Sequence, residues 1–528
     1  MLSYRKLAMR VLGRPLHTGG GIDSPRPASQ RAAAFILTAA MLTTFTAPAF
    51  AKTWYIENGN ITVKAGEAEG PNKVKQGDSD FVKDEGDTII TGTSDKNTVT
   101  IDAGNDKVEV TLKDVNIKAD SGSALTSNGD VTLTLKGENH LTGGISDNGS
   151  YGLSGISSSG SLTISGGETD SLTAQGGSGT DGSGGRGIFS KDLTISGGTV
   201  NANGGDGKNG SGGSGITSLG SLTISGGTVN ANGGDGTNSS DGGDGITNNR
   251  GVTISSGGTV TAKGGSGEDG SGGRGISSFG GVTISSGGTV TATGGNSTGS
   301  DGSGGDGISS TSTTISGGTV TADGGSGNFS GGNGIRSFDV AISGGTVNVA
   351  GGNGGNGSGS DVGNGIYSSD IDLSGSLELT AKAGSPNGKA LSQRGNELDL
   401  DDIKDKLGPG AKVTAINANG DSKQVSIPRP VEPEEPVIPG DSSSSSGGGS
   451  ADASVQESVF PGLVVTDKDG QRISYTSTQS GNTLTVCVGR FTASFHISLA
   501  ALRQLRAEGI DTITFQTILC STTLSVDE

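Results

Sequence analysis

Five aspartates stand in glycine-rich segments of the repeat region and are the first candidates for acid–base chemistry: Asp181, Asp206, Asp235, Asp269 and Asp301. Cleavage of a glycosidic bond needs paired carboxylates, or carboxylates beside basic groups, on one face. None of the five recurs as a close pair beside a histidine or arginine, and the only histidines are His17, His140 and His496. We therefore expect no catalytic residues and no enzyme activity.

Two of these segments resemble a calcium-binding repeat. Residues 176–181 and 264–269 match the first six positions of the calcium-binding nonapeptide. The eighth position should be a large aliphatic residue, but Ser183 and Ser271 stand there. Loop carboxylates and carbonyls could still bind calcium weakly at extracellular concentrations. The sequence predicts no metal ligand set and no other cofactor.

Four aromatic residues could stack against sugar rings, because a flat apolar face fits the axial hydrogens of a sugar. Phe189, Phe279, Phe338 and Tyr367 each closely follow a Gly-Ile pair. On one exposed edge they would form a binding strip, whereas packed inward they would fill a corner. A second candidate surface is polar and contains Asn201, Asn203, Asn230 and Asn232.

A repeat of about thirty residues must position these side chains. Its first aliphatic track is Ile156, Ile188, Ile216, Ile246, Ile276, Ile308, Ile335 and Ile366, spaced 27 to 32 residues apart. A second track passes through segments such as 282–285 and a third through segments such as 289–292. Three short strands per repeat follow from these tracks.

Alternation within each strand decides which side chains face inward. In the segment 222–225, Leu222 and Ile224 are two apart and face one side, while the hydroxyl residues face the other. Gly-Gly pairs such as 226–227 and 257–258 supply positive φ at corners. Antiparallel hairpins are the competing architecture, but the constant period favours successive coils that stack equivalent residues on each other. We predict an all-β, single-stranded parallel β-helix of about ten coils, right-handed by default.

Composition changes divide the chain further. Residues 52–427 form the predicted β-helix, with a cap around Trp54 and a C-terminal cap made of a short helix at 398–407 and a strand pair at 411–427. Residues 428–454 read as a Pro/Glu-rich and then Ser/Gly-rich linker. Residues 455–528 read as a small α+β domain with one helix after Ser498.

The cysteines, Cys487 and Cys520, both lie in this last domain. In an exported protein they could form a disulfide, and buried free thiols are the alternative. Both interpretations, a disulfide and two buried free thiols, stay open.

Export is expected from the N-terminus, where basic residues precede the apolar run 32–47 and a small-x-small pattern ends at Ala51. Residues 1–51 are thus a predicted signal peptide. Translation could instead start downstream, as at Met9, and the alternative to a cleaved signal is an uncleaved membrane anchor. The sequence has no second apolar run that would predict a transmembrane span. A net charge of -18 argues against nucleic-acid partners. We expect a secreted or surface-associated protein.

A family resemblance adds to this. The segment 131–144, Gly155-Ile156 and the segment 161–167 resemble bacterial extracellular proteins described as carbohydrate-binding domain-containing, over about residues 90–400. The resemblance implies a β-helix that binds glycans, without identifying ligand residues. The expected function is non-catalytic carbohydrate binding or adhesion, with an extracellular glycan or host surface component as partner. A structural stalk is the alternative, and a polysaccharide-degrading β-helix enzyme a remote one.

Overall fold

The computed structural model divides the chain into two compact units, before and after the boundary between Glu432 and Pro433. It describes residues 52–67, 70–255, 257–285, 287–355 and 363–429 of the first unit. In the second it describes residues 463–466, 473, 475–480, 482–488, 494–497, 505–506, 510–517 and 521–525. The predicted signal peptide and most of the predicted linker lie outside these residues.

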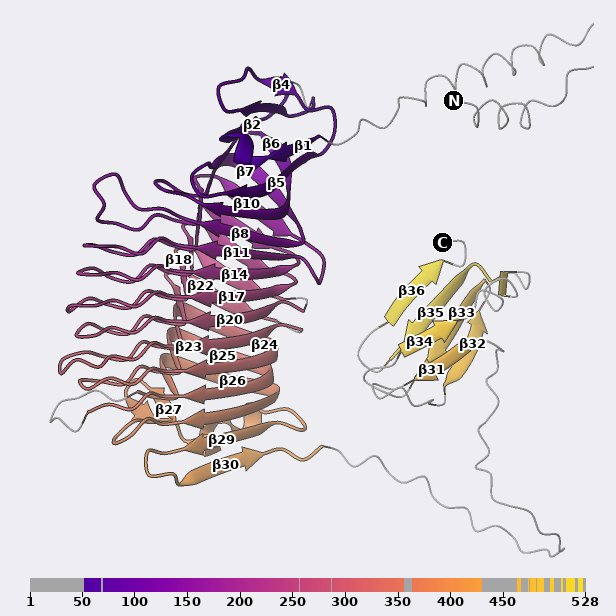
Figure 1. The fold of residues 1–528 in the computed structure, drawn as a ribbon. Coiled ribbons are helices and arrows are strands. Elements are labelled where there is room, and N and C mark those ends of the chain that lie inside the picture. Colours follow the sequence, from indigo (N-terminus) through magenta and orange to yellow (C-terminus); the bar gives the residue numbers. More distant parts are fainter. Residues whose placement is uncertain are drawn as a thin grey trace, which may run out of the picture. The chain divides into compact units, whose positions relative to one another are not determined.

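The first unit is a parallel β-solenoid of about twelve turns, which confirms the predicted fold, although the prediction counted about ten coils. Strands from successive coils lie side by side along the axis (Figure 1). In the central coils each turn contributes one strand to each of three parallel sheets, as the three aliphatic tracks predicted.

The first sheet has short strands whose first and third residues are buried. They are β9 (Ile156–Ser158), β12 (Ile188–Ser190), β15 (Ile216–Ser218), β18 (Ile246–Asn248) and β21 (Ile276–Ser278). The second sheet contains β10 (Ser161–Ser165), β13 (Asp192–Ile195), β16 (Ser221–Ile224), β19 (Gly251–Ile254) and β22 (Gly281–Ile284).

The third sheet contains β11 (Ser171–Gln175), β14 (Thr199–Asn203), β17 (Thr228–Asn232), β20 (Thr259–Lys263) and β23 (Thr289–Thr293). In later coils one bent strand passes through all three sheets: β24 (Ile308–Asp323), β25 (Ile335–Ala350) and β26 (Ile366–Lys382). Earlier coils use β6 (Val99–Lys118), β7 (Leu125–Lys136) and β8 (Glu138–Thr142).

The core is a column of aliphatic rungs. Ile224 pairs in register with Ile195 before it and Ile254 after it, and all three side chains are fully buried. At the corner before the third sheet, Gly227 and Gly257 have φ of 73° and 83°, as the Gly-Gly pairs predicted. Burial of apolar area along these rungs is the main favourable contribution to folding.

Both ends of the solenoid are capped. At the N-terminal end lie β1 (Thr53–Tyr55), the 3-10 helix η1 (Ile56–Asn58), β2 (Ile61–Lys64), β3 (Lys73–Gln76), β4 (Val82–Lys83) and β5 (Thr88–Ser94). Trp54 is buried there, and its Nε1 donates to Asp84 Oδ2 at 2.8 Å. At the C-terminal end lie β27 (Leu391–Gln393), β28 (Asn396–Glu397), η3 (Leu400–Lys406), β29 (Lys412–Ile416) and the antiparallel β30 (Ser422–Ser426).

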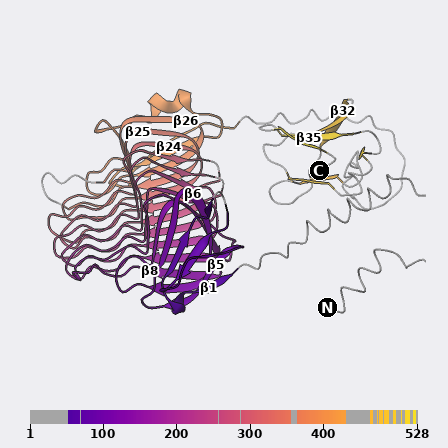
Figure 2. The ribbon, with the colours of Figure 1, turned by 90° about the horizontal axis from the view of Figure 1, so that it is seen from above.

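Glycine-rich loops project from one side of every central coil and stack on each other (Figures 1 and 2). We call this stack the glycine fin; its loops are residues 176–187, 204–215, 233–245, 264–275, 294–307 and 324–334. Each loop has an outgoing and a returning arm. Gly234 N on an outgoing arm donates to Gly213 O of the preceding coil, and Gly243 N on the returning arm donates to Gly234 O. The fin is therefore a backbone-bonded double layer.

The C-terminal unit has two small sheets. One pairs β31 (Leu463–Thr466) with β34 (Ser494–Ile497), and the other contains β32 (Thr476–Ser480), β33 (Thr483–Cys487), β35 (Thr512–Gln516) and β36 (Ser521–Ser525). Leu505 and Arg506 are helical. The rest of the predicted helix after Ser498 lies outside the described residues. The rings of Phe495 and Phe515 lie 4.5 Å apart in the core.

Candidate functional site

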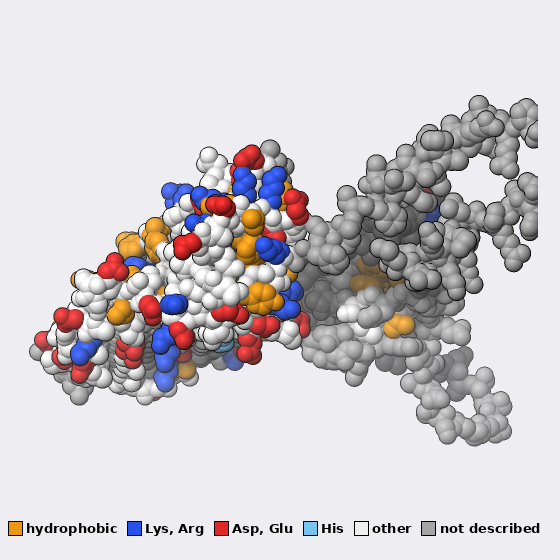
Figure 3. Space-filling view, turned by 45° about the horizontal axis from the view of Figure 1, so that its top comes forward, with side chains coloured by type: hydrophobic (Ala, Val, Ile, Leu, Met, Phe, Trp, Pro, Cys, Tyr) orange, Lys and Arg blue, Asp and Glu red, His pale blue; other side chains and the backbone are white. Residues whose placement is uncertain are grey.

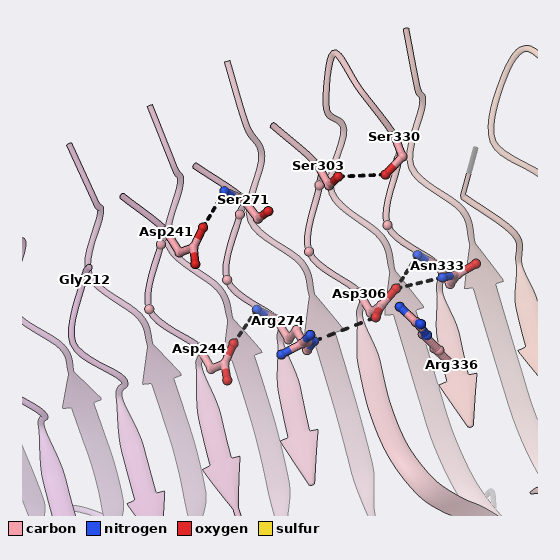
Figure 4. A pocket seen from close by; sticks show the side chains of 18 of the residues that line it. Gly212, Asp241, Asp244, Ser271, Arg274, Ser303, Asp306, Ser330, Asn333 and Arg336 are labelled. Atoms are coloured by element: carbon pink, nitrogen blue, oxygen red, sulfur yellow. Dashed lines mark hydrogen bonds and ion pairs between the residues drawn. The ribbon is translucent and has the colours of Figure 1, made fainter. Parts of the chain in front are cut away.

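A groove of about 700 Å³ runs along the solenoid between the returning arms of the glycine fin and the first sheet. Figure 4 shows successive coils placing one residue each in two rows along it. The outer row contains Ser211, Asp241, Ser271, Ser303 and Ser330. The inner row contains Ser214, Asp244, Arg274, Asp306, Asn333 and Asn364. Each inner-row residue directly precedes a Gly-Ile pair that begins a strand of the first sheet.

Hydrogen bonds between coils hold the inner row. Asp306 Oδ1 accepts from the backbone N of Asn333 at 2.7 Å and from its Nδ2 at 2.9 Å. Asn333 Oδ1 accepts in the same way from the backbone N of Asn364 at 3.0 Å. Asp244 Oδ1 accepts from Arg274 N at 2.7 Å. An inner-row side chain thus satisfies an amide of the next coil, and the row stabilises the wall of the groove.

The charges in the groove alternate along the row. Burial raises the pKa of the Asp244 carboxyl, although the N–H and the charge of Arg274 act in the opposite direction. Arg274 Nε lies 3.9 Å from Asp306 Oδ2. The neighbouring coils therefore alternate acid, base and acid, so this part of the groove has little net charge.

The role of the inner row gives a stability prediction. Replacing Asp306 with alanine leaves the Asn333 amide without its acceptor, so we expect a loss of about 1–3 kcal/mol in the free energy of unfolding. Asp306→Asn keeps an oxygen at the same place, as Asn333 does one coil later, and should cost under about 1 kcal/mol. Urea denaturation measures both. Equal losses would mean that the ion pair with Arg274, not the backbone bond, is the dominant contact.

One end of the groove carries a cation and a ring. Arg336 and Tyr367 are Cα partners in β25 and β26, and both line the groove. Arg336 is exposed, and its guanidinium makes no hydrogen bond or ion pair with any other described residue. Tyr367 is 41% exposed. This end therefore presents an unengaged guanidinium beside an aromatic ring.

The four predicted aromatic residues lie in two neighbouring columns, one on the outer face of the first sheet and one at its corner. Phe189 and Tyr367 occupy the middle position of their strands, in the column that continues through Thr217, Thr247, Ser277, Ser309 and Arg336. Phe279 and Phe338 lie at the adjoining corner, with one coil between them. They are 73% and 67% exposed. Phe189 is half-buried, with the Arg186 guanidinium 5.3 Å from its ring.

The structure thus shows exposed rather than inward-packed rings at Phe279 and Phe338, but it does not gather the four into one continuous strip. Phe189 stands six coils from Tyr367 in the same column, separated by the five residues named above. Phe338 and Tyr367 occupy successive coils in adjacent columns and are the nearest approach to the predicted strip. We call the outward residues of the first sheet and its corner, together with the groove, the first-sheet face.

The predicted asparagines lie on a different sheet, the third. Asn230 Nδ2 donates to Asn201 Oδ1 at 2.8 Å, and Asn232 Nδ2 donates to Asn203 Oδ1 at 2.9 Å. They align in register with Thr261 and Lys263 of the next coil, as predicted. These amides bond to each other along the stack, so part of their hydrogen-bonding capacity already serves the fold.

The aspartates considered at the outset lie in the glycine fin. Asp206 Oδ1 accepts from Asp235 N at 2.9 Å, and Asp235 Oδ1 accepts from Ser266 N at 2.7 Å, so these two bridge coils. His140 is exposed on β8, and His496 belongs to β34. Among the described residues no group of three or more His, Cys, Asp and Glu could hold a metal ion. Cys487 ends β33, whereas Cys520 lies outside the described residues, so their pairing stays a prediction.

Charged side chains of both signs are interspersed over the solenoid on the face in Figure 3, and hydrophobic side chains form small separate groups. Within the described part of the chain, no helix has the length and apolarity that a membrane span needs. No protein-family model, no curated protein and no solved structure matches the chain. The carbohydrate-binding role implied by resemblance therefore stays a prediction.

Proposed function

We propose that the protein binds an extended glycan along the first-sheet face, without catalysis, as a secreted or surface-associated protein. The observation that carries the proposal is the placement of exposed Phe338 and Tyr367 in adjacent columns and successive coils, beside a groove lined with hydroxyl, amide and carboxylate groups. Aromatic faces stack on sugar rings, and the polar rows can bond to sugar hydroxyls.

The direction of the groove favours a polymer over a small molecule. The groove is lined by residues from six successive coils, from Ser211 to Tyr367. At about 4.8 Å per coil it extends for roughly 24 Å between the first and the last of these coils. Phe279 and Phe338 lie two coils apart, about 10 Å by the same spacing. A chain of sugars lying parallel to the solenoid axis can contact both rings and both polar rows together.

Binding is tested on a glycan array with the full chain, followed by titration calorimetry on the glycans that bind. We expect micromolar affinity that falls at least about tenfold in the double variant Phe279→Ala/Phe338→Ala and severalfold in Tyr367→Ala. Phe81→Ala is the matched control, since Phe81 is 40% exposed but precedes β4 in the N-terminal cap.

Three results would count against the proposal. Unchanged affinity in the folded double variant would remove the aromatic rings at the corner from the binding site. An equal loss in Phe81→Ala would show that the effect is not local to the first-sheet face. Absence of binding to every glycan on the array would favour the alternative, a structural stalk whose function belongs to the terminal modules.

A further inference from the structure

Asn-Gly pairs can react without an enzyme. The backbone nitrogen of the glycine attacks Cγ of the asparagine and forms an N–Cγ bond, while the Cγ–Nδ2 bond breaks. The proton of the glycine amide leaves with Nδ2 as ammonia. Water then opens the five-membered succinimide ring, giving aspartate or isoaspartate. The reaction needs a glycine nitrogen that is free to attack, and glycine favours it because it has no Cβ to block the approach.

Twelve Asn-Gly pairs occur in the sequence, and all but the one at Asn356 lie within the described residues. At nine of them the glycine N–H donates to a backbone oxygen: Gly59, Gly149, Gly204, Gly233, Gly334, Gly354, Gly365, Gly388 and Gly420. Gly129 lies inside β7 at a register shift, where it has no Cα partner on β6, and the side chain of the asparagine before it is held by Gly104 N, which donates to Asn128 Oδ1 at 3.3 Å. The remaining glycine, Gly210, has an N–H with no hydrogen bond to any described residue.

The asparagine before Gly210 has an uncommon backbone conformation and an exposed position. Asn209 lies at the tip of the fin loop 204–215, is exposed, and has φ of 58°. Non-glycine residues seldom occupy this left-handed region, and asparagine is one of the few that enter it readily. An exposed tip also gives water access to the succinimide, which water must open in the second step. Both features distinguish Asn209 from the asparagines held in strands.

The side chain of Asn209 is held, but only by contacts exposed to solvent. Its Nδ2 donates to Asp181 Oδ1 at 2.6 Å, and its Oδ1 accepts from Asn238 Nδ2 at 2.5 Å. Water competes with such bonds, so each restrains the side chain weakly. By contrast, Asn203 and Asn232 bond to each other from the ends of β14 and β17. Each of them also precedes a glycine whose N–H is engaged by the next coil.

We infer that Asn209 is a modification site, the first of the eleven described Asn-Gly sites to deamidate. The product places a new carboxylate against Asp181 and removes the amide that donated to it. Isoaspartate also lengthens the backbone by one methylene at a tip packed against Gly182 and Ser183. Modification therefore weakens the bonds that join the tips of neighbouring fin loops.

The test is a time course of the full chain at neutral pH, with peptides analysed by mass spectrometry that separates aspartate from isoaspartate. We expect Asn209 to convert at least about tenfold faster than Asn203 or Asn232, because their glycines must first give up a hydrogen bond. Asn238→Ala removes the contact to Asn209 Oδ1 and should speed conversion at Asn209 while leaving Asn203 unchanged.

A parallel time course in denaturant separates structure from sequence. There the Asn-Gly pairs should react at similar rates. If Asn209 were still the fastest under denaturing conditions, the fold would not be the cause. Conversion of the exposed turn residues Asn148 or Asn419 before Asn209 in the native protein would also overturn the inference.

Discussion

Replacing Gly234 with alanine is expected to destabilise the solenoid by about 3 kcal/mol, a large effect for the addition of one methyl group. A Cβ at Gly234 would lie 2.1 Å from the carbonyl oxygen of Gly205 and 2.5 Å from its carbonyl carbon. Both atoms belong to the backbone of the preceding coil, so no side-chain rotation can relieve the overlap. Loop 233–245 must move away from loop 204–215, which breaks the bond from Gly234 N to Gly213 O.

Gly251→Ala provides the matched control. A Cβ there would meet the Gly281 oxygen at 3.4 Å, an ordinary contact, and the residue begins a strand of the second sheet. Alanine should be neutral or slightly stabilising at Gly251. Thermal and urea denaturation followed by circular dichroism measure both variants. Similar midpoints for Gly234→Ala and Gly251→Ala would show that the fin is not closely packed.

Truncation of a core rung should have an effect of similar size. Ile254 is fully buried and stacks in register between Ile224 and Ile284. Ile254→Ala removes buried apolar atoms and leaves a cavity between coils, so we expect a loss of about 2–5 kcal/mol. In a solenoid each coil contacts mainly its two neighbours. The loss of stability should therefore be confined to the contacts of this coil with the coils before and after it.

The residue next to Ile254 provides the comparison. Thr253 is exposed on the outer face of the same strand, and Thr253→Ala should change stability by less than about 0.5 kcal/mol. Hydrogen exchange would show whether protection falls around β19 in the Ile254 variant. If the threonine variant lost more stability than the isoleucine variant, the inward and outward assignment of the second sheet would be reversed.

The aliphatic tracks predicted most of the solenoid because burial and strand alternation leave a signal in each repeat. Successive residues of a strand face opposite sides of the sheet, so Ile254 faces the core and is apolar, whereas Thr253 faces outward and is polar. The short helix of the C-terminal cap was also predictable, since residues 398–407 have helical character, and Leu400–Lys406 form η3. The fin was not predictable as a packed layer, because the contact between Gly234 and Gly205 exists only once two coils are stacked.

The candidate site was predictable in part. Sequence reasoning identified Tyr367, Phe279 and Phe338 from their position after Gly-Ile pairs, and the structure places all three outward on the first-sheet face. It missed the inner row of the groove, whose members differ in type from coil to coil. A signal was available, since a polar residue such as Asp306 precedes each of these Gly-Ile pairs. Only the register between coils shows that these polar residues line up as one row along the groove.

Crystallography of the full chain with a glycan that binds on the array tests the central claim most directly. We predict a chain of sugars parallel to the solenoid axis, with rings stacked on Tyr367 and Phe338 and hydroxyl groups bonded to the polar rows of the groove. Sugar density on the third sheet around Asn201 and Asn230, with the first-sheet face empty, would contradict the account.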